Sequence, residues 1–279
     1  MIELAKNFNK NTLKNKNAII TGGGGLLGPR HGIALARAGA NVTLIDINKE
    51  GLERAKKEIL IDVEEANVFT SVLDITSLAA VEDFENNYFQ GKDFFHILVN
   101  NAAINPKMKE TNSTASGRVE DYDMDEWNKE LNVGITGSFI CSRIFGSKMA
   151  ENNDGVIINI SSDLAIRAPD QRVYSPTETF DDIKQFKPIG YSVVKTALIG
   201  MTKYLAEYWG RFGIRVNALL PGGVLDGQQE HIIKNVEKRT LLGRWANIDE
   251  YEDAIVFLSS DASAYMTGQS IIIDGGRSV

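Results

Sequence analysis

The chain has 279 residues, of which 43% are hydrophobic and 24% are charged, as is usual for a globular protein with a sizeable core. Its formal net charge of −7 argues against a nucleic-acid partner. Because Cys141 is the only cysteine, no disulfide can form within the chain, which is typical of the reducing cytoplasm. The sequence contains no apolar run of membrane-spanning or signal-peptide length, so we expect a cytoplasmic protein that binds no membrane.

Short apolar runs alternate with helix-length segments along the whole chain. This alternation predicts a parallel sheet with helices on both faces, and the dominance of Ile, Val and Leu in the runs indicates strands buried on both sides. We therefore expect a single doubly wound, Rossmann-type α/β domain over residues 1–279, with a seven-stranded parallel sheet. The predicted strands are Asn17–Thr21, Asn41–Asp46, Val68–Asp74, His96–Asn101, Gly155–Ser162, Arg215–Leu220 and Ser270–Asp274, and the predicted helices are 29–38, 48–60, 77–90, 123–150, 190–211 and 249–260.

A glycine-rich stretch from Thr21 to Gly28 follows the first strand and opens the first helix. At this place backbone N–H groups and a helix N-terminus can bind the pyrophosphate of a dinucleotide. Asp46 ends the second strand, 18 residues after Gly28, where a carboxylate can accept hydrogen bonds from ribose hydroxyls and repel a 2′-phosphate. We therefore expect NAD rather than NADP, although Asp46 could instead cap a helix and the nearby Arg30 and Arg37 could weaken the preference.

Tyr191 and Lys195 are four residues apart in a predicted helix and so lie on one face of it. A cation at this distance is expected to lower the pKa of the phenol toward neutrality, which would make Tyr191 a general acid/base. The spacing alone also fits an ordinary amphipathic helix, so the other motifs decide the interpretation. The three histidines show no ligand spacing, and no metal is expected.

Further stretches follow in a fixed order: Asn100–Ala103, Ile158–Ser162, Pro221–Val224 and Met266–Gly276. Together with the glycine loop and the Tyr–Lys pair, they resemble the short-chain dehydrogenase/reductase superfamily over essentially the whole chain. The resemblance implies NAD(P)-dependent hydride transfer to or from a secondary alcohol or ketone, with a small-molecule substrate and a homodimer or homotetramer built on helices 123–150 and 190–211. The catalytic residues that it implies are Ser162, Tyr191 and Lys195, and the cofactor-binding residues are Gly22, Gly25, Leu27, Gly28, Asp46, Asp74, Asn101, Ala102, Tyr191, Lys195, Pro221, Gly222 and Val224.

Two departures from the family pattern concern single positions. Leu26 stands where oxidoreductases of this type usually have a glycine, and the spacing of the remaining glycines resembles sugar-nucleotide epimerases and dehydratases. Those enzymes normally carry an additional C-terminal domain, for which this chain is too short. Gly134 stands at the position of the family's catalytic asparagine, and the nearby Asn132 is expected to point away from the site.

The third departure is an insertion at residues 163–189, which separates Ser162 from Tyr191 by 29 positions. Its charges and prolines predict a lid over a polar, sugar-like and anionic substrate, with Arg167, Gln171 and Arg172 as candidate substrate-binding residues. A solvated loop or an arm that contacts a second subunit would fit as well.

The stretches 161–171 and 22–30 resemble oxidoreductases encoded with bacterial flagellin-modification and nonulosonate sugar genes. The alternatives that remain open are a sugar epimerase or dehydratase that uses NAD transiently and a non-catalytic nucleotide-binding protein.

Overall fold

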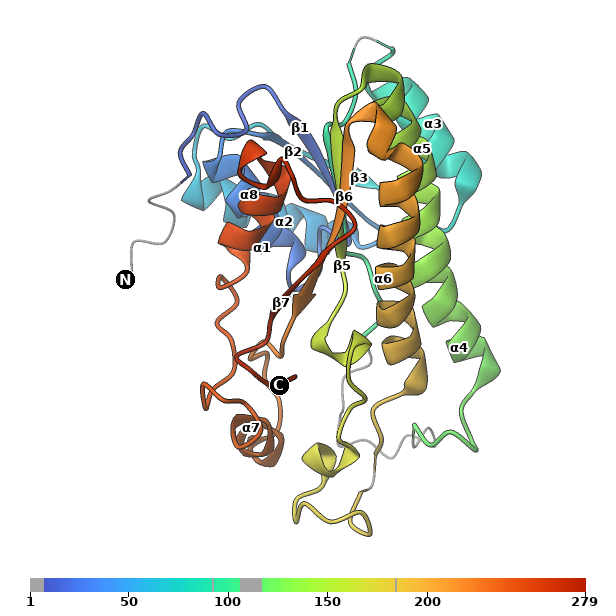
Figure 1. Ribbon diagram of the computed structural model, residues 1–279, viewed down its shortest axis with the longest axis vertical. Helices are drawn as coiled ribbons and strands as arrows, with labels where there is room; N and C mark the ends of the chain where they lie inside the picture. Colours follow the sequence, from blue (N-terminus) through green and yellow to red (C-terminus); the bar gives the residue numbers. More distant parts are fainter. Residues whose placement is uncertain (1–7, 92, 106–116, 184) are drawn as a thin grey trace.

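Seven parallel strands form one sheet in the order β3-β2-β1-β4-β5-β6-β7 in the computed structural model, which describes residues 8–91, 93–105, 117–183 and 185–279 (Figure 1). The strand order reverses between β1 and β4, and doubly wound sheets bind ligands in the crevice at the carboxyl ends of the strands at such a reversal. The strands are β1 (Asn17–Thr21), β2 (Asn41–Asp46), β3 (Val68–Val72), β4 (Ile97–Asn100), β5 (Gly155–Ile160), β6 (Ile214–Pro221) and β7 (Ser270–Ile273).

All seven predicted strands are therefore confirmed. The central strands β1, β4 and β5 are buried at every residue, which explains their continuous apolar sequences, whereas the edge strands β3 and β7 are partly exposed. The predictions ran too far at the carboxyl ends of several strands. Asp74, Asn101 and Ser162 lie just beyond β3, β4 and β5, so these polar residues face the crevice instead of extending the sheet.

Helices cover both faces of the sheet (Figure 1). On one face α1, α2 and α8 bury residues such as Ile33, Ile59 and Ile255, and on the other α3, α5 and α6 bury residues such as Phe145 and Trp209. The helices are α1 (Gly28–Arg37), α2 (Lys49–Asp62), α3 (Leu78–Tyr88), α4 (Met124–Leu131), α5 (Ser138–Asn152), α6 (Ile189–Trp209), α7 (Glu230–Glu237) and α8 (Glu252–Ser259).

The helix predicted over 123–150 consists of α4 and α5 joined by a π-helical turn, η1 (Asn132–Gly137). Two buried glycines explain how this turn packs so closely. A Cβ atom on Gly134 would lie 2.3 Å from Val194 Cγ1, and one on Gly137 would lie 2.7 Å from Ile75 Cδ1. The turn therefore presses its backbone against α6, next to the crevice.

The insertion at residues 163–189 packs against α7, a helix that the sequence analysis did not predict (Figure 1). Arg239, which follows α7, forms ion pairs with Asp170 and Glu178 at 2.9 Å each. Asn235 of α7 donates to two backbone carbonyls of the insertion at 3.0 and 3.1 Å. The insertion and α7 thus form one connected wall. Within the described ranges, no helix is long and apolar enough to cross a membrane.

Candidate active site

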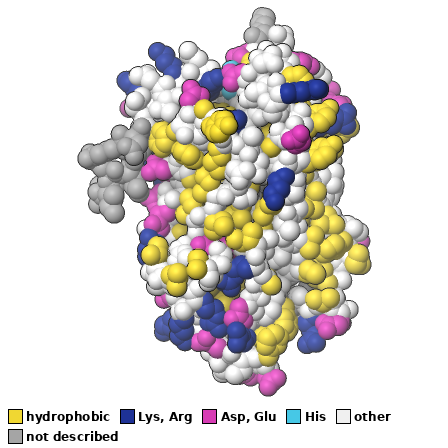
Figure 2. Space-filling model, in the orientation of Figure 1, with side chains coloured by type: hydrophobic (Ala, Val, Ile, Leu, Met, Phe, Trp, Pro, Cys, Tyr) yellow, Lys and Arg dark blue, Asp and Glu magenta, His cyan; other side chains and the backbone are white. Residues whose placement is uncertain are grey.

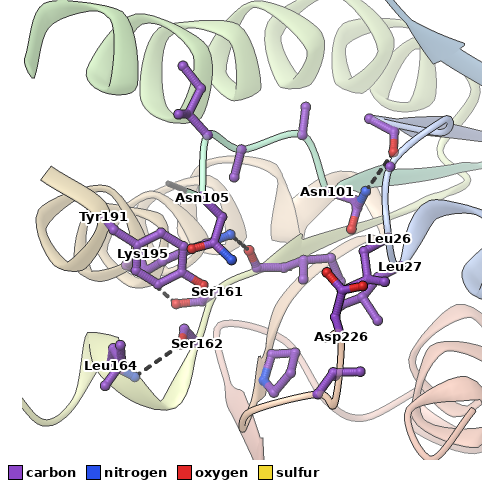
Figure 3. A pocket seen from close by; sticks show the side chains of 18 of the residues that line it. Leu26, Leu27, Asn101, Asn105, Ser161, Ser162, Leu164, Tyr191, Lys195 and Asp226 are labelled. Atoms are coloured by element: carbon purple, nitrogen blue, oxygen red, sulfur yellow. Dashed lines mark hydrogen bonds between the residues drawn. The ribbon is translucent and has the colours of Figure 1, made fainter. Parts of the chain in front are cut away.

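A cavity of about 1050 Å³ opens at the carboxyl ends of the strands, between the glycine loop and the insertion (Figure 3). The three predicted catalytic residues line it, as do all the predicted cofactor-binding residues except Gly28. The three predicted substrate residues do not line it. The cavity therefore gathers most of the residues selected from sequence, although they come from segments far apart in the chain.

The glycine loop is shaped to admit a close backbone approach. Gly22 has a φ of +63°, and a Cβ atom there would lie 2.8 Å from the Cα of Ala102. A Cβ atom on Gly28 would lie 2.5 Å from the carbonyl oxygen of Gly22, so Gly28 packs the start of α1 onto the loop. Leu27, at the N-cap of α1, makes no side-chain hydrogen bond to the first turn and so does not compete with a pyrophosphate for the amides there.

Asp46 joins the end of β2 to the glycine loop. Its two carboxylate oxygens accept hydrogen bonds from the amides of Gly24 (3.0 Å) and Asn48 (2.9 Å). These bonds orient the carboxylate at the cavity wall. Arg30 and Arg37, the cations that the sequence placed near Asp46, both form ion pairs with Glu252 of α8.

Asn101 has a clear structural role in addition to its place on the wall. Its side-chain amide donates to the carbonyls of Thr21 and Gly22 at 3.0 and 3.1 Å. In return, the hydroxyl of Thr21 accepts from the amides of Asn101 and Ala102 at 3.0 Å each. These four bonds fix the glycine loop to the end of β4. Asp74 also lines the cavity, and its carboxylate accepts from the amide and hydroxyl of Thr76.

Ser162, Tyr191 and Lys195 meet where β5 ends and α6 begins (Figure 3). Lys195 Nζ lies 5.6 Å from the centre of the Tyr191 ring and donates to the carbonyl of Ile160 at 2.7 Å. The Ser162 hydroxyl donates to Asp163 Oδ1 at 3.0 Å and accepts from the amide of Leu164 at 3.1 Å. This arrangement presents a hydroxyl, a phenol and an ammonium group to one side of the cavity.

The expected lowering of the Tyr191 pKa is wrong for the protein without its ligands. Burial raises the pKa of Tyr191 to about 12, and a hydrogen bond with Ser162 opposes that change. Burial, reinforced by the neighbouring Lys187, lowers the pKa of Lys195 to about 8. Desolvation therefore outweighs the attraction that the Tyr–Lys spacing implied, because Tyr191 is buried and Lys195 is itself removed from water.

Val194 fills the space at Gly134, the position of the family's asparagine. Since its Cγ1 would lie only 2.3 Å from a Cβ atom on Gly134, an asparagine does not fit there. Asn132 is exposed and is not part of the cavity wall, as expected from its place in the helix. Position 134 therefore cannot hold an asparagine, and Asn132 does not take over the role of that residue in the cavity.

The wall also includes residues that were not selected from sequence, among them Asp163, Tyr174, Lys187 and Arg277. Lys187 Nζ donates to Asn105 Oδ1 at 2.5 Å and lies 4.3 Å from the centre of the Tyr191 ring. Burial lowers the pKa of Lys187 to about 8 and raises the pKa of Tyr174 to about 12. Asp163 immediately follows Ser162, and that adjacency was the one signal in the sequence that could have identified it.

The predicted substrate residues have other partners. Arg172 is exposed and pairs with Asp170 at 2.9 Å. Gln171 exchanges two hydrogen bonds with the backbone of Lys187, and Arg167 donates to the backbone carbonyl of Arg277. Gln171 and Arg167 thus contact the backbone of two wall residues, whereas the side chain of Arg172 bonds to Asp170 instead. Among the described residues, no group of three or more His, Cys, Asp or Glu side chains could hold a metal ion.

Comparisons with known proteins agree with this geometry. A family model described as short chain dehydrogenase matches residues 16–178, and one described as enoyl-(acyl carrier protein) reductase matches residues 183–278. The chain is 31% identical to 2-dehydro-3-deoxy-D-gluconate 5-dehydrogenase of Bacillus subtilis, with 95% of both chains covered. It is 30% identical to D-threitol dehydrogenase of Mycolicibacterium smegmatis, with 96% of this chain and 94% of the relative covered.

Two solved structures show the same fold. A short chain dehydrogenase of Leptospira borgpetersenii with bound NAD+ superposes with a TM-score of 0.82 at 27% identity, covering 97% of this chain and 95% of that chain. A gluconate 5-dehydrogenase of Burkholderia cenocepacia in complex with NADP and tartrate gives 0.81 at 26% identity, covering 96% and 97%. With the nucleotide-binding loop and the Ser–Tyr–Lys cluster in one cavity, the chain belongs to the short-chain dehydrogenase family, whose members are NAD(P)-dependent alcohol dehydrogenases and ketone reductases.

Proposed function

We propose that this protein is an NAD-dependent dehydrogenase that oxidises a secondary hydroxyl group of a polyhydroxylated, sugar-like substrate or reduces the corresponding ketone. The observation that carries the proposal is the meeting of Ser162, Tyr191 and Lys195 in one cavity beside the glycine loop. The nicotinamide supplies the hydride chemistry, while the protein orients the substrate and transfers the proton.

Each catalytic side chain has a distinct task. The Ser162 hydroxyl, fixed by the amide of Leu164, hydrogen-bonds the reacting oxygen of the substrate. Tyr191 takes the hydroxyl proton during oxidation and returns it during reduction. The Ile160 carbonyl occupies one of the three N–H donors of Lys195, which leaves two for the hydroxyls of the nicotinamide ribose. The Lys195 charge then also favours the phenolate that forms on Tyr191.

The lining of the cavity beyond Tyr191 favours a polar substrate. Asp163, Lys187 and Arg277 contribute charged groups there, and an apolar steroid or acyl chain would remove them from water without supplying hydrogen bonds. The relatives named for gluconate and threitol support a sugar acid or sugar alcohol. The narrower resemblance to enzymes of flagellin modification and nonulosonate sugars stays a prediction, and so does a cytoplasmic location.

NAD is the proposed cofactor, although the structural relatives bind NAD in one case and NADP in another. The carboxylate of Asp46 at the end of β2 supports this choice, because such a group can accept from ribose hydroxyls and repels a 2′-phosphate. Arg30 and Arg37 form ion pairs with Glu252. The negative charge of Asp46, with Arg30 and Arg37 paired to Glu252, disfavours the additional phosphate.

We further propose that two copies of the chain associate through α5 and α6. Phe139, Tyr204 and Tyr208 expose 47%, 69% and 56% of their surface on these helices. Apolar side chains run along the flank of the molecule where α5 and α6 lie (Figure 2). Exposed aromatic groups on adjoining helices are typical of a protein interface.

An epimerase or dehydratase that uses NAD transiently is the second candidate, favoured by the spacing of Gly22, Gly25 and Gly28. Such an enzyme would keep its cofactor bound and would show no net change in nicotinamide oxidation state. The relatives that the chain covers over nearly their full length are dehydrogenases, which supports the first candidate.

The proposal is tested by following nicotinamide reduction with NAD and NADP across a panel of sugar alcohols and sugar acids. We expect turnover with NAD, and a loss of about 10²–10⁴-fold in kcat for Tyr191→Phe with NAD affinity unchanged. Tyr208→Phe, which changes an exposed hydroxyl on the same helix, is the matched control. Wild-type turnover by Tyr191→Phe would overturn the assigned role. Inversion of configuration at a substrate carbon without net reduction of the nicotinamide would favour the epimerase.

A further inference from the structure

Arg277 is a buried cation on the cavity wall whose guanidinium lacks hydrogen-bond partners. Its side chain is 8% exposed, and the nearest carboxylate oxygen, Asp163 Oδ2, lies 3.6 Å from Nη1, beyond hydrogen-bonding distance. Its Nε atom has no partner, and the guanidinium donates no hydrogen bond to any residue in the described ranges. Because burying an unsatisfied charged group is costly, this arrangement indicates a ligand that supplies the missing acceptors.

The backbone around Arg277 is held firmly on both sides. The carboxylate of Asp274 accepts from the amides of Gly276 and Ser278 at 2.9 and 2.8 Å. Arg167, from the insertion, donates to the carbonyl of Arg277 itself. The backbone that carries the Arg277 side chain is therefore fixed before any ligand binds, which lowers the entropic cost of binding.

Asp163 links Arg277 to the reacting centre. Its side chain is 4% exposed, its Oδ1 accepts from Ser162 at 3.0 Å, and its Oδ2 has no hydrogen-bond partner. One carboxylate thus lies between the catalytic serine and the guanidinium. Both groups line the same cavity as Ser162 and Tyr191, so a substrate chain that extends from the reacting carbon can meet them.

We propose that Arg277 binds an anionic group of the substrate, a carboxylate or a phosphate, and that Asp163 accepts a hydrogen bond from a neighbouring substrate hydroxyl. This inference rests on the proposed function of the site and narrows its substrates to polyhydroxylated compounds with an anionic group. A guanidinium can donate two parallel hydrogen bonds to such a group. Lys187 and Lys195 line the same cavity and add to the attraction.

The test compares D-gluconate with D-glucitol, which differ only in a carboxylate against a hydroxymethyl group. Binding of each to the enzyme saturated with NADH is measured by calorimetry, and D-glucitol 6-phosphate serves as the phosphate probe. The wild-type enzyme should bind an anionic probe about 10- to 100-fold more tightly than D-glucitol, because D-glucitol lacks the charged group that accepts hydrogen bonds from Arg277. The anionic probe with the larger gain in affinity over D-glucitol shows whether the site prefers a carboxylate or a phosphate.

In Arg277→Met this advantage should disappear while the affinities for D-glucitol and NADH stay unchanged. Arg277→Lys, which keeps the charge but not the two parallel donors, should retain part of it. Arg211→Met, on the exposed surface beyond α6, is the matched control and should keep the full advantage.

Two results would overturn the inference: a wild-type enzyme without preference for either anion, or an equal loss of D-glucitol, D-gluconate and NADH binding in Arg277→Met. Failure of the proposed function is recognised separately, as the absence of nicotinamide reduction with every polyol and sugar acid despite Arg277-dependent binding of an anion.

Discussion

Lys187 connects the active site to the pH dependence of stability. Burial lowers its pKa from 10.5 in the unfolded chain to about 8, so below pH 8 the folded state carries a buried charge at full cost. Between pH 8 and 10.5 the folded chain loses this proton while the unfolded chain keeps it, and stability rises. Lys187→Met should therefore be more stable than the wild type at neutral pH, with a difference that shrinks across this interval.

Urea unfolding at a series of pH values measures that difference directly. Lys148→Met is the matched control, because Lys148 is on the surface and pairs with Glu151 at 3.0 Å. A difference between Lys187→Met and the wild type that stays constant from pH 8 to 10.5 would contradict the assignment.

Single residues show which parts of the site could be predicted from sequence. Ser162, Tyr191 and Lys195 were found because they belong to motifs with fixed spacing and a fixed place at the end of a strand or the start of a helix. Lys187 and Arg277 were missed because the burial of a lone cation depends on segments distant in the chain. The charges chosen in their place, Arg167 and Arg172, bond to the backbone of Arg277 and to Asp170.

At the level of elements, the close packing of η1 on α6 leads to a prediction about Gly134. In an ordinary helix, alanine is favoured over glycine by about 1 kcal/mol. Here a Cβ atom would lie 2.3 Å from Val194 Cγ1, so Gly134→Ala should instead lower the free energy of unfolding by about 1–3 kcal/mol. Adding Val194→Ala removes the obstructing methyl groups and should restore part of the loss.

Gly200→Ala is the matched control, because a Cβ atom at this helical position of α6 meets no described atom within 4 Å. It should stabilise the protein slightly. If urea unfolding shows Gly134→Ala to be as stable as Gly200→Ala, the close packing of η1 against α6 is not present in solution.

The insertion and α7 should act together as a lid, because Arg239 holds both. Arg239→Met removes its bonds to Asp170 and Glu178 and should lower kcat/KM on the order of tenfold, about 1.4 kcal/mol, with NAD affinity unchanged. Arg37→Met, which breaks ion pairs with Asp62 and Glu252 rather than with the insertion, should leave kcat/KM unaltered. Equal kcat/KM values for Arg239→Met and Arg37→Met would contradict a lid formed by the insertion and α7.

Elements were predictable where one physical signal dominates. Continuous apolar runs located the seven strands, because strands of a covered parallel sheet are buried on both sides. The eight residues of α7 were not predicted, and the structure shows this helix packed against the insertion, whose conformation the sequence left open. The π-helical turn also depends on tertiary packing, since it follows from the fit of Gly134 and Gly137 against side chains of other segments.

For the molecule as a whole, the flank of α5 and α6 leads to a prediction about assembly. Tyr204 and Tyr208 stack on each other with ring centres 6.3 Å apart and present their outer faces to solvent. An interface between two copies would bury these rings, and two carboxylates in their place would remain charged and unpaired. The double variant Tyr204→Asp/Tyr208→Asp should weaken association by at least about 100-fold, and light scattering should show a single chain.

The control for this experiment is Ile61→Asp, which places the same charge on α2, at a side chain 86% exposed on a different face of the sheet. It should keep the mass of the wild type. The double variant should still bind NAD when folded, because the glycine loop and Asp46 lie within one chain. A wild-type protein that is already a single chain, or a double variant with unchanged mass, would show that α5 and α6 do not form the interface.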